Sequence, residues 1–117
     1  MYRLILILFF TSPTFAQSEK LIWSQDGSAL AFCSKDKPIK CFVICNNESV
    51  DVSTVELSNL GKIGRYKYEK INTFPLNWES NDSSGCMVWF KTQAWVDGQR
   101  YTVKEPVWVS NGKYYGR

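Results

Sequence analysis

Four cysteines, Cys33, Cys41, Cys45 and Cys86, are the residues of this chain best suited to a defined chemistry. Four thiolates can hold zinc, but cysteine zinc sites usually contain a C-x-x-C pair. The spacings here are eight, four and forty-one positions, and the chain has no histidine. The lack of C-x-x-C also disfavours a redox enzyme. We therefore interpret the four cysteines as two disulfides, with no metal and no cofactor.

Strand geometry ranks the three possible cysteine pairings. The run 41–45 is apolar on both faces, as a central strand is, so its two cysteines lie about 13 Å apart, beyond disulfide reach. Cys33 and Cys41 flank a polar loop and can face each other across a hairpin, which leaves Cys45 to bond Cys86. We favour this pairing. Cys33 with Cys45 and Cys41 with Cys86 is the alternative.

The last third of the chain carries a second set of chemically useful residues. Segments 86–96 and 99–109 alternate around Asp97-Gly98, a pair that accepts the positive φ angles of a type I′ turn. The sequence predicts a long hairpin in which Trp95 pairs with Arg100 and Lys91 with Lys104. With Met87 beside them, the candidate binding residues on one face are Trp89, Lys91, Trp95, Arg100, Lys104 and Trp108.

Tryptophan rings on such a face can stack on sugar rings or anchor a protein contact, and we expect Arg100 to lie over Trp95. Pro106 is expected to introduce a bulge that turns Trp108 to the other face. The alternative interpretation is structural, with half-buried tryptophans covered by lysine stems. The opposite face is expected to be core, and its residues are Cys86, Val88, Phe90, Thr92, Ala94, Tyr101, Val103 and Val107.

The rest of the sequence supplies the elements that must hold these residues. Strands are expected at 21–23 and 29–33, around a turn, and an exposed or edge strand at 65–71, where tyrosines alternate with charges. After the turn at 46–49 the apolar pattern continues through Val50, Val52, Val55 and Leu57, and no segment of helical period is long enough to predict a helix. The pattern predicts an all-β, disulfide-stapled, two-sheet β-sandwich, with a small β-barrel as the alternative.

A bond between Cys45 and Cys86 resembles the staple between the sheets of immunoglobulin-like domains, and the turn 82–85 is similar to the one that leads into their strand F. The hairpin that closes at Gly98 resembles the last two strands of a fibronectin type III domain. These likenesses are architectural and cover at most half of the chain. No tyrosine stands two residues before Cys86, where immunoglobulin domains carry one. The resemblance implies a sandwich and names no family.

The amino terminus has the pattern of a cleavable signal peptide at 1–16: Arg3, an apolar run at 4–10, a polar break, and small residues up to Ala16. Residues 17–117 are then expected to form a single β-rich domain, periplasmic or secreted, with no membrane span after cleavage. Without Arg3 this domain carries 13 basic and 11 acidic residues. A net charge of +2 is too small to indicate nucleic acid as a partner.

We do not expect an enzyme, because the chain has no histidine for a Ser-His or Cys-His dyad. We expect an exported binding protein that recognises another protein or a cell-envelope polymer through the aromatic and basic hairpin face. One alternative is an inhibitor or exclusion factor that inserts the loop 34–40, with Lys35, Lys37 and Lys40, into a secreted hydrolase or envelope machine. Another is a structural subunit of an exported assembly, joined through the edge strand 65–71.

Overall fold

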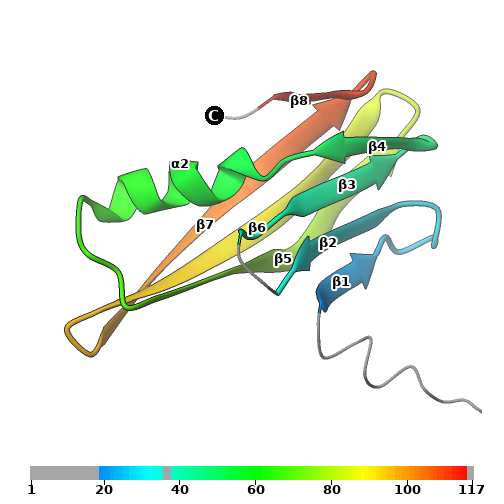
Figure 1. Cartoon of the computed structure of the whole chain (residues 1–117). Coiled ribbons are helices and arrows are strands. Elements are labelled where there is room, and N and C mark those ends of the chain that lie inside the picture. The colour runs from blue at the N-terminus through cyan, green and yellow to red at the C-terminus, as the bar shows by residue number, and fades with distance from the viewer. Residues whose placement is uncertain (1–18, 36–37, 116–117) are drawn as a thin grey trace, which may run out of the picture.

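The computed structural model describes residues 19–35 and 38–115 (Figure 1). The signal peptide predicted at 1–16 lies outside these residues, and so does Lys37 of the basic loop. The elements in chain order are β1 (Glu19–Trp23), β2 (Leu30–Ser34), β3 (Cys41–Cys45), β4 (Glu48–Asp51), α2 (Thr54–Ile63), β5 (Lys70–Asp82), β6 (Gly85–Val96), β7 (Gln99–Ser110) and β8 (Lys113–Tyr115).

The strands form two four-stranded antiparallel sheets, which confirms the all-β two-sheet sandwich. Sheet A has the order β1-β2-β3-β4 and sheet B the order β5-β6-β7-β8. Figure 1 shows sheet A and α2 on the same side of the long strands β5, β6 and β7. The strand order differs from that of immunoglobulin domains, in which strands close in sequence are divided between the sheets. Here the chain passes from one sheet to the other once, through α2 and the segment 64–69.

The core lies between the two sheets and is stapled by the predicted disulfides. Cys33 bonds Cys41, its direct partner across β2 and β3, and the two Cα atoms lie 4.0 Å apart. Cys45 of sheet A bonds Cys86 of sheet B with a Cα separation of 6.1 Å, and we call this bond the inter-sheet disulfide. All four cysteines are buried among valines, alanines and Phe90. Both predicted pairings are therefore confirmed.

The long hairpin of β6 and β7 has the predicted register, with Val96 opposite Gln99. Asp97 and Gly98 have φ angles of 51° and 78°, as a type I′ turn requires. The bulge expected at Pro106 is wrong, because the register runs through that residue without a shift. Strand β8 pairs only with the last residues of β7, so among the described residues Pro106 interrupts no ladder on that side. The irregularities lie in β5 instead, near Pro75 and Trp78.

The helix α2 was not expected from the sequence. Its buried residues are Val55 and Asn59, whereas Leu57 points outward with 69% of its surface exposed. A helix with a partly polar inner face and an apolar outer residue hides the periodicity from which helices are recognised. The edge strand predicted at 65–71 is also wrong over most of its length, because 64–69 is irregular and β5 begins at Lys70.

Candidate binding face

The candidate site is the outer face of sheet B. In β6 every second residue from Cys86 to Ala94 is buried, and sheet A and α2 lie on that inner side. The alternate residues of β6 point outward and are half-buried, and no described element covers them. We call this surface the aromatic-cationic face. Its residues are Lys70, Asn72, Phe74, Leu76, Asn77, Met87, Trp89, Lys91, Gln93, Trp95, Arg100, Thr102, Lys104, Pro106 and Trp108.

The structure brings all six predicted binding residues onto this one face. Trp95 lies opposite Arg100, and Lys91 lies opposite Lys104. Trp108 lies opposite Met87 and therefore stays on the face, because Pro106 causes no bulge. That these residues bind a partner stays a prediction. The expected core on the inner face is confirmed over most of the hairpin, but Tyr101, near the turn, is 37% exposed.

The cation over Trp95 is Lys70, not the expected Arg100. The Lys70 ammonium nitrogen lies 5.0 Å from the centre of the Trp95 ring. Arg100 is the neighbour of Trp95 on the opposite strand, β7, and its side chain is exposed. Lys70 is the first residue of β5, which pairs with β6 along its whole length. Sequence reasoning missed it because the position of β5 beside β6 depends on the tertiary fold. Lys70 and Trp95 make a cation–π pair that holds this ring in place.

Lys91 and Lys104 are direct cross-strand partners, so two like charges face each other at the middle of the face. Such a pair destabilises a sheet. Among the described residues the one ion pair is Lys62–Glu105, on the other side of sheet B, so no carboxylate lies at ion-pair distance from either lysine. Beside Lys104 is a hollow of about 240 Å³, lined also by Leu76, Asn77 and Trp89. A bound anion would relieve the repulsion at this point.

The tryptophans are held in different ways. The Trp89 indole nitrogen donates a hydrogen bond of 2.9 Å to Glu79, which stands at the bulge of β5 after Trp78. Trp108 lies so close to Gly85 that a Cβ atom there would be 2.7 Å from its ring. Trp108 therefore closes the turn between β5 and β6, and the structural interpretation fits it better than it fits Trp89 or Trp95.

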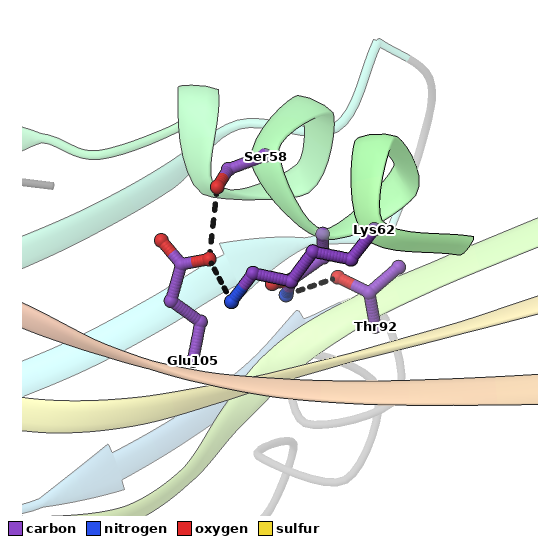
Figure 2. Close-up of polar contacts among 5 residues, drawn as sticks. Ser58, Lys62, Thr92 and Glu105 are labelled. Atoms are coloured by element: carbon purple, nitrogen blue, oxygen red, sulfur yellow. Dashed lines mark hydrogen bonds and ion pairs between the residues drawn. The ribbon is translucent and has the colours of Figure 1, made fainter. Parts of the chain in front are cut away.

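A polar cluster beneath α2 is the other chemically notable group. Glu105 is fully buried and accepts hydrogen bonds from Ser58 at 2.8 Å and Lys62 at 3.0 Å (Figure 2). Asn59 donates to Thr92 at 2.9 Å, and the Thr92 hydroxyl lies 3.0 Å from that of Thr73. Ser58, Lys62 and Glu105 line neither of the hollows beside the helix. We therefore interpret the cluster as the attachment of α2 to sheet B.

The Glu105 carboxylate also acts on Tyr114 of β8. Burial raises the pKa of Tyr114, the negative charge of Glu105 raises it further, and a hydrogen bond with Thr54 opposes both effects. Thr54 is the first residue of α2, so the helix start, Glu105 and β8 meet at one place. This contact adds to the polar attachment of the helix.

The two alternative surfaces differ in their support. The basic loop closes through two hydrogen bonds, one between the Ser34 amide and the Lys40 carbonyl at 2.8 Å and one from the Lys40 amide to the Ser34 hydroxyl at 3.0 Å. Lys35 and Lys40 are exposed, so insertion of this loop into a partner stays a prediction. The strand expected at 65–71 is not present, because 64–69 is irregular. The edge of sheet B is β5, which carries two irregularities that oppose further pairing, and assembly through an edge strand stays a prediction.

Comparison of the chain with models of protein families, with curated proteins and with solved structures finds no match. Within the described ranges, no helix has the length and apolar character needed to span a bilayer.

Proposed function

We propose that this protein is an extracytoplasmic binding protein whose aromatic-cationic face holds an anionic polysaccharide. The observation that carries the proposal is the like-charged pair Lys91 and Lys104, set between Trp89 and Trp95. Among the described residues neither lysine has an ion-pair partner, and no described element covers this face of sheet B. Carboxylate, phosphate or sulfate groups of the polymer lie between the two lysines, and its sugar rings stack on the indoles.

The layout of the face suits a chain-like ligand. Trp89 and Trp95 are six residues apart on one strand, which is about 20 Å along β6. Lys91 lies between them, and Lys70 and Arg100 flank the far tryptophan. With Gln93 before the second tryptophan, the order along the strand is aromatic, cationic, polar, aromatic, which makes a track several sugar rings long. An open track of this kind accepts an extended polymer better than a small molecule, which needs a concave pocket.

Two observations support action outside the cytoplasm. Both disulfides are buried and link residues of one chain, as is typical of proteins from oxidising compartments. The signal peptide predicted at 1–16 adds the route. We therefore infer a periplasmic or secreted protein that meets envelope or extracellular polymers.

Calorimetric titration with two matched polymers tests the proposal. Polygalacturonate carries a carboxylate on every sugar, and its methyl ester has the same backbone without the charge. We expect the oxidised protein to bind polygalacturonate, to bind the ester at least about tenfold more weakly, and to lose affinity as salt rises. Equal affinity for the two polymers, or binding to neither, overturns the proposal and favours a protein partner.

Three variants connect the binding to the face. Trp95→Ala and the double variant Lys91→Gln with Lys104→Gln should each weaken polygalacturonate binding at least about tenfold. Trp23→Ala is the matched control, because Trp23 lies on sheet A and is 60% exposed. It should bind as the wild type does. If Trp23→Ala weakens binding as much as Trp95→Ala, the face is wrongly assigned.

A further inference from the structure

A second surface lies beside α2 and does not belong to the aromatic-cationic face. It is a hollow of about 630 Å³ between the second half of the helix and the segment that follows. Its lining residues are Leu57, Leu60, Gly61, Gly64, Arg65, Tyr66, Lys67 and Tyr68. The segment is held by the Tyr68 hydroxyl, which donates to the carbonyl oxygens of Gly64 and Leu60. The hollow is therefore part of the folded structure and has defined walls.

Gly61 lies inside α2, where glycine weakens a helix. No described residue requires the absence of a side chain at Gly61. Outside its own helix turn and its chain neighbours, a Cβ atom built there has no described heavy atom within 4 Å, and its φ angle lies outside the positive range. By contrast, a Cβ at Gly64 would lie 2.9 Å from the Tyr66 ring. The space above Gly61 opens into the hollow. Glycine is used where a bound molecule comes close to the backbone, and this explains why position 61 carries no side chain.

The walls of the hollow combine fixed aromatic rings with free cations. The Tyr66 ring stacks on Tyr101 with 6.3 Å between centres and meets Tyr68 edge to face at 6.2 Å. Arg65 and Lys67 are exposed, and none of the lining residues is acidic. Within the described parts of the chain neither cation has an ion-pair partner. The charge of the hollow is therefore complementary to an anionic ligand.

Leu57 extends this surface across the helix. It is 69% exposed, and it also lines a second hollow of about 610 Å³, on the side of Ile39 and Ile71. The second hollow is also lined by Glu56, so the part of an occupant that crosses Leu57 into it is apolar, and its acidic part stays beside Arg65 and Lys67. Such an occupant is longer than a drug-sized molecule, whose pockets measure about 300–1,000 Å³ and enclose most of the ligand.

We propose that this surface binds an extended acidic peptide segment of a partner protein. One large apolar side chain of the peptide lies against Leu57, Leu60 and Tyr66, close over Gly61, and its carboxylates pair with Arg65 and Lys67. The site lies on the α2 side of sheet B, so a polymer on the aromatic-cationic face and this peptide can be bound together. The inference does not depend on the polysaccharide proposal.

The test is a titration of the oxidised, nitrogen-15-labelled protein followed by NMR. The probe is an acetylated hexapeptide, Asp-Glu-Phe-Asp-Glu-Leu, and the control peptide has lysine in place of each acidic residue. We expect the acidic peptide to shift amide signals of residues 57–68, and the lysine peptide to bind at least about tenfold more weakly. Shifts confined to other residues, or equal affinity for the two peptides, overturn the proposal.

Two substitutions at Gly61 separate binding from folding. Alanine and leucine both favour a helix over glycine, so Gly61→Ala and Gly61→Leu should each raise the melting temperature. Gly61→Leu fills the hollow and should weaken the acidic peptide at least about tenfold, and should leave polygalacturonate binding unchanged. Unchanged peptide affinity in Gly61→Leu overturns the site. Dodecanoate, tested below its micelle concentration, overturns the peptide as occupant if it binds residues 57–68 more tightly than the peptide does.

Discussion

The ion pair beneath α2 predicts unequal costs for the loss of its two partners. Glu105 is fully buried, and the Lys62 side chain is 50% exposed. Lys62→Met leaves a buried carboxylate with Ser58 as its remaining hydrogen-bond donor. Glu105→Gln leaves an ammonium group that turns into water, and the amide keeps the shape of the carboxylate. The same contact is lost in both variants, but only the first strands a buried charge.

The two costs follow from this difference. Breaking a buried pair so that a charge stays behind costs about 3–5 kcal/mol, and water entry beside the half-exposed Lys62 position lowers this to about 2–4 kcal/mol. Loss of hydrogen bonds without a stranded charge costs about 1 kcal/mol, which applies to Glu105→Gln. The double variant should cost about as much as Glu105→Gln alone, so the coupling energy between the two residues is about 2–4 kcal/mol.

Equilibrium unfolding in urea at neutral pH, with both disulfides intact, measures these costs. At a slope of about 1 kcal/mol per molar urea, the midpoint should fall by about 2–4 M in Lys62→Met and by about 1 M in Glu105→Gln. Circular dichroism of the folded variants controls for a change of fold. If Glu105→Gln costs as much as Lys62→Met or more, then Lys62→Met does not leave Glu105 as a stranded buried charge, and the reasoning is refuted.

Three further predictions concern stability. Replacing both cysteines of the inter-sheet disulfide by alanine should cost about 4 kcal/mol, and the same change at Cys33 and Cys41 about 2.5 kcal/mol. The inter-sheet disulfide closes the longer loop and so removes more entropy from the unfolded chain. If urea unfolding shows the larger loss for the Cys33–Cys41 bond, this entropic explanation is wrong. Lys104→Thr should stabilise the protein by about 0.2–1 kcal/mol in urea unfolding, since it removes the repulsion by Lys91, and should weaken polygalacturonate binding; a loss of stability contradicts this. Hydrogen bonds from Ser28, and a further one from Ser24, hold the pKa of Asp26 well below its usual range. The pKa of Asp26 is lower in the folded than in the unfolded protein, so the stabilisation that is present above about pH 4 is lost as the pH falls. In Asp26→Asn the melting temperature should therefore fall less steeply between about pH 5 and 2 than in the wild type.

The parts of the site that were predicted correctly rest on local patterns. The register of β6 and β7 follows from Asp97-Gly98 and from the alternation of the residues around it. The distance that a single strand imposes between Cys41 and Cys45 excludes one of the three disulfide pairings, and the hairpin around 34–40 favours the pairing that the structure has. The hairpin register and the excluded cysteine pairing depend only on the period of a strand and on the conformations open to a two-residue turn.

The parts that were missed depend on residues far apart in the chain. The helix α2 escaped notice because Ser58 and Lys62 face inward only on account of Glu105, more than forty positions later. The cation over Trp95 could not be assigned, because Lys70 reaches that ring only when β5 lies beside β6. From the sequence alone, polar residues such as Ser58 and Lys62 are assigned to the surface, because their buried partner is not known.

Local patterns in the sequence favour the sandwich class and the observed disulfide pairing, and they place Trp89, Lys91, Trp95 and Lys104 on one face. Backbone conformation and side-chain period are properties of neighbouring residues, so a local pattern is enough for them. The tertiary structure alone decided the helix, the buried ion pair beneath it and the hollow over Gly61. These depend on which distant elements come into contact, and that choice is made by the packing of the whole chain.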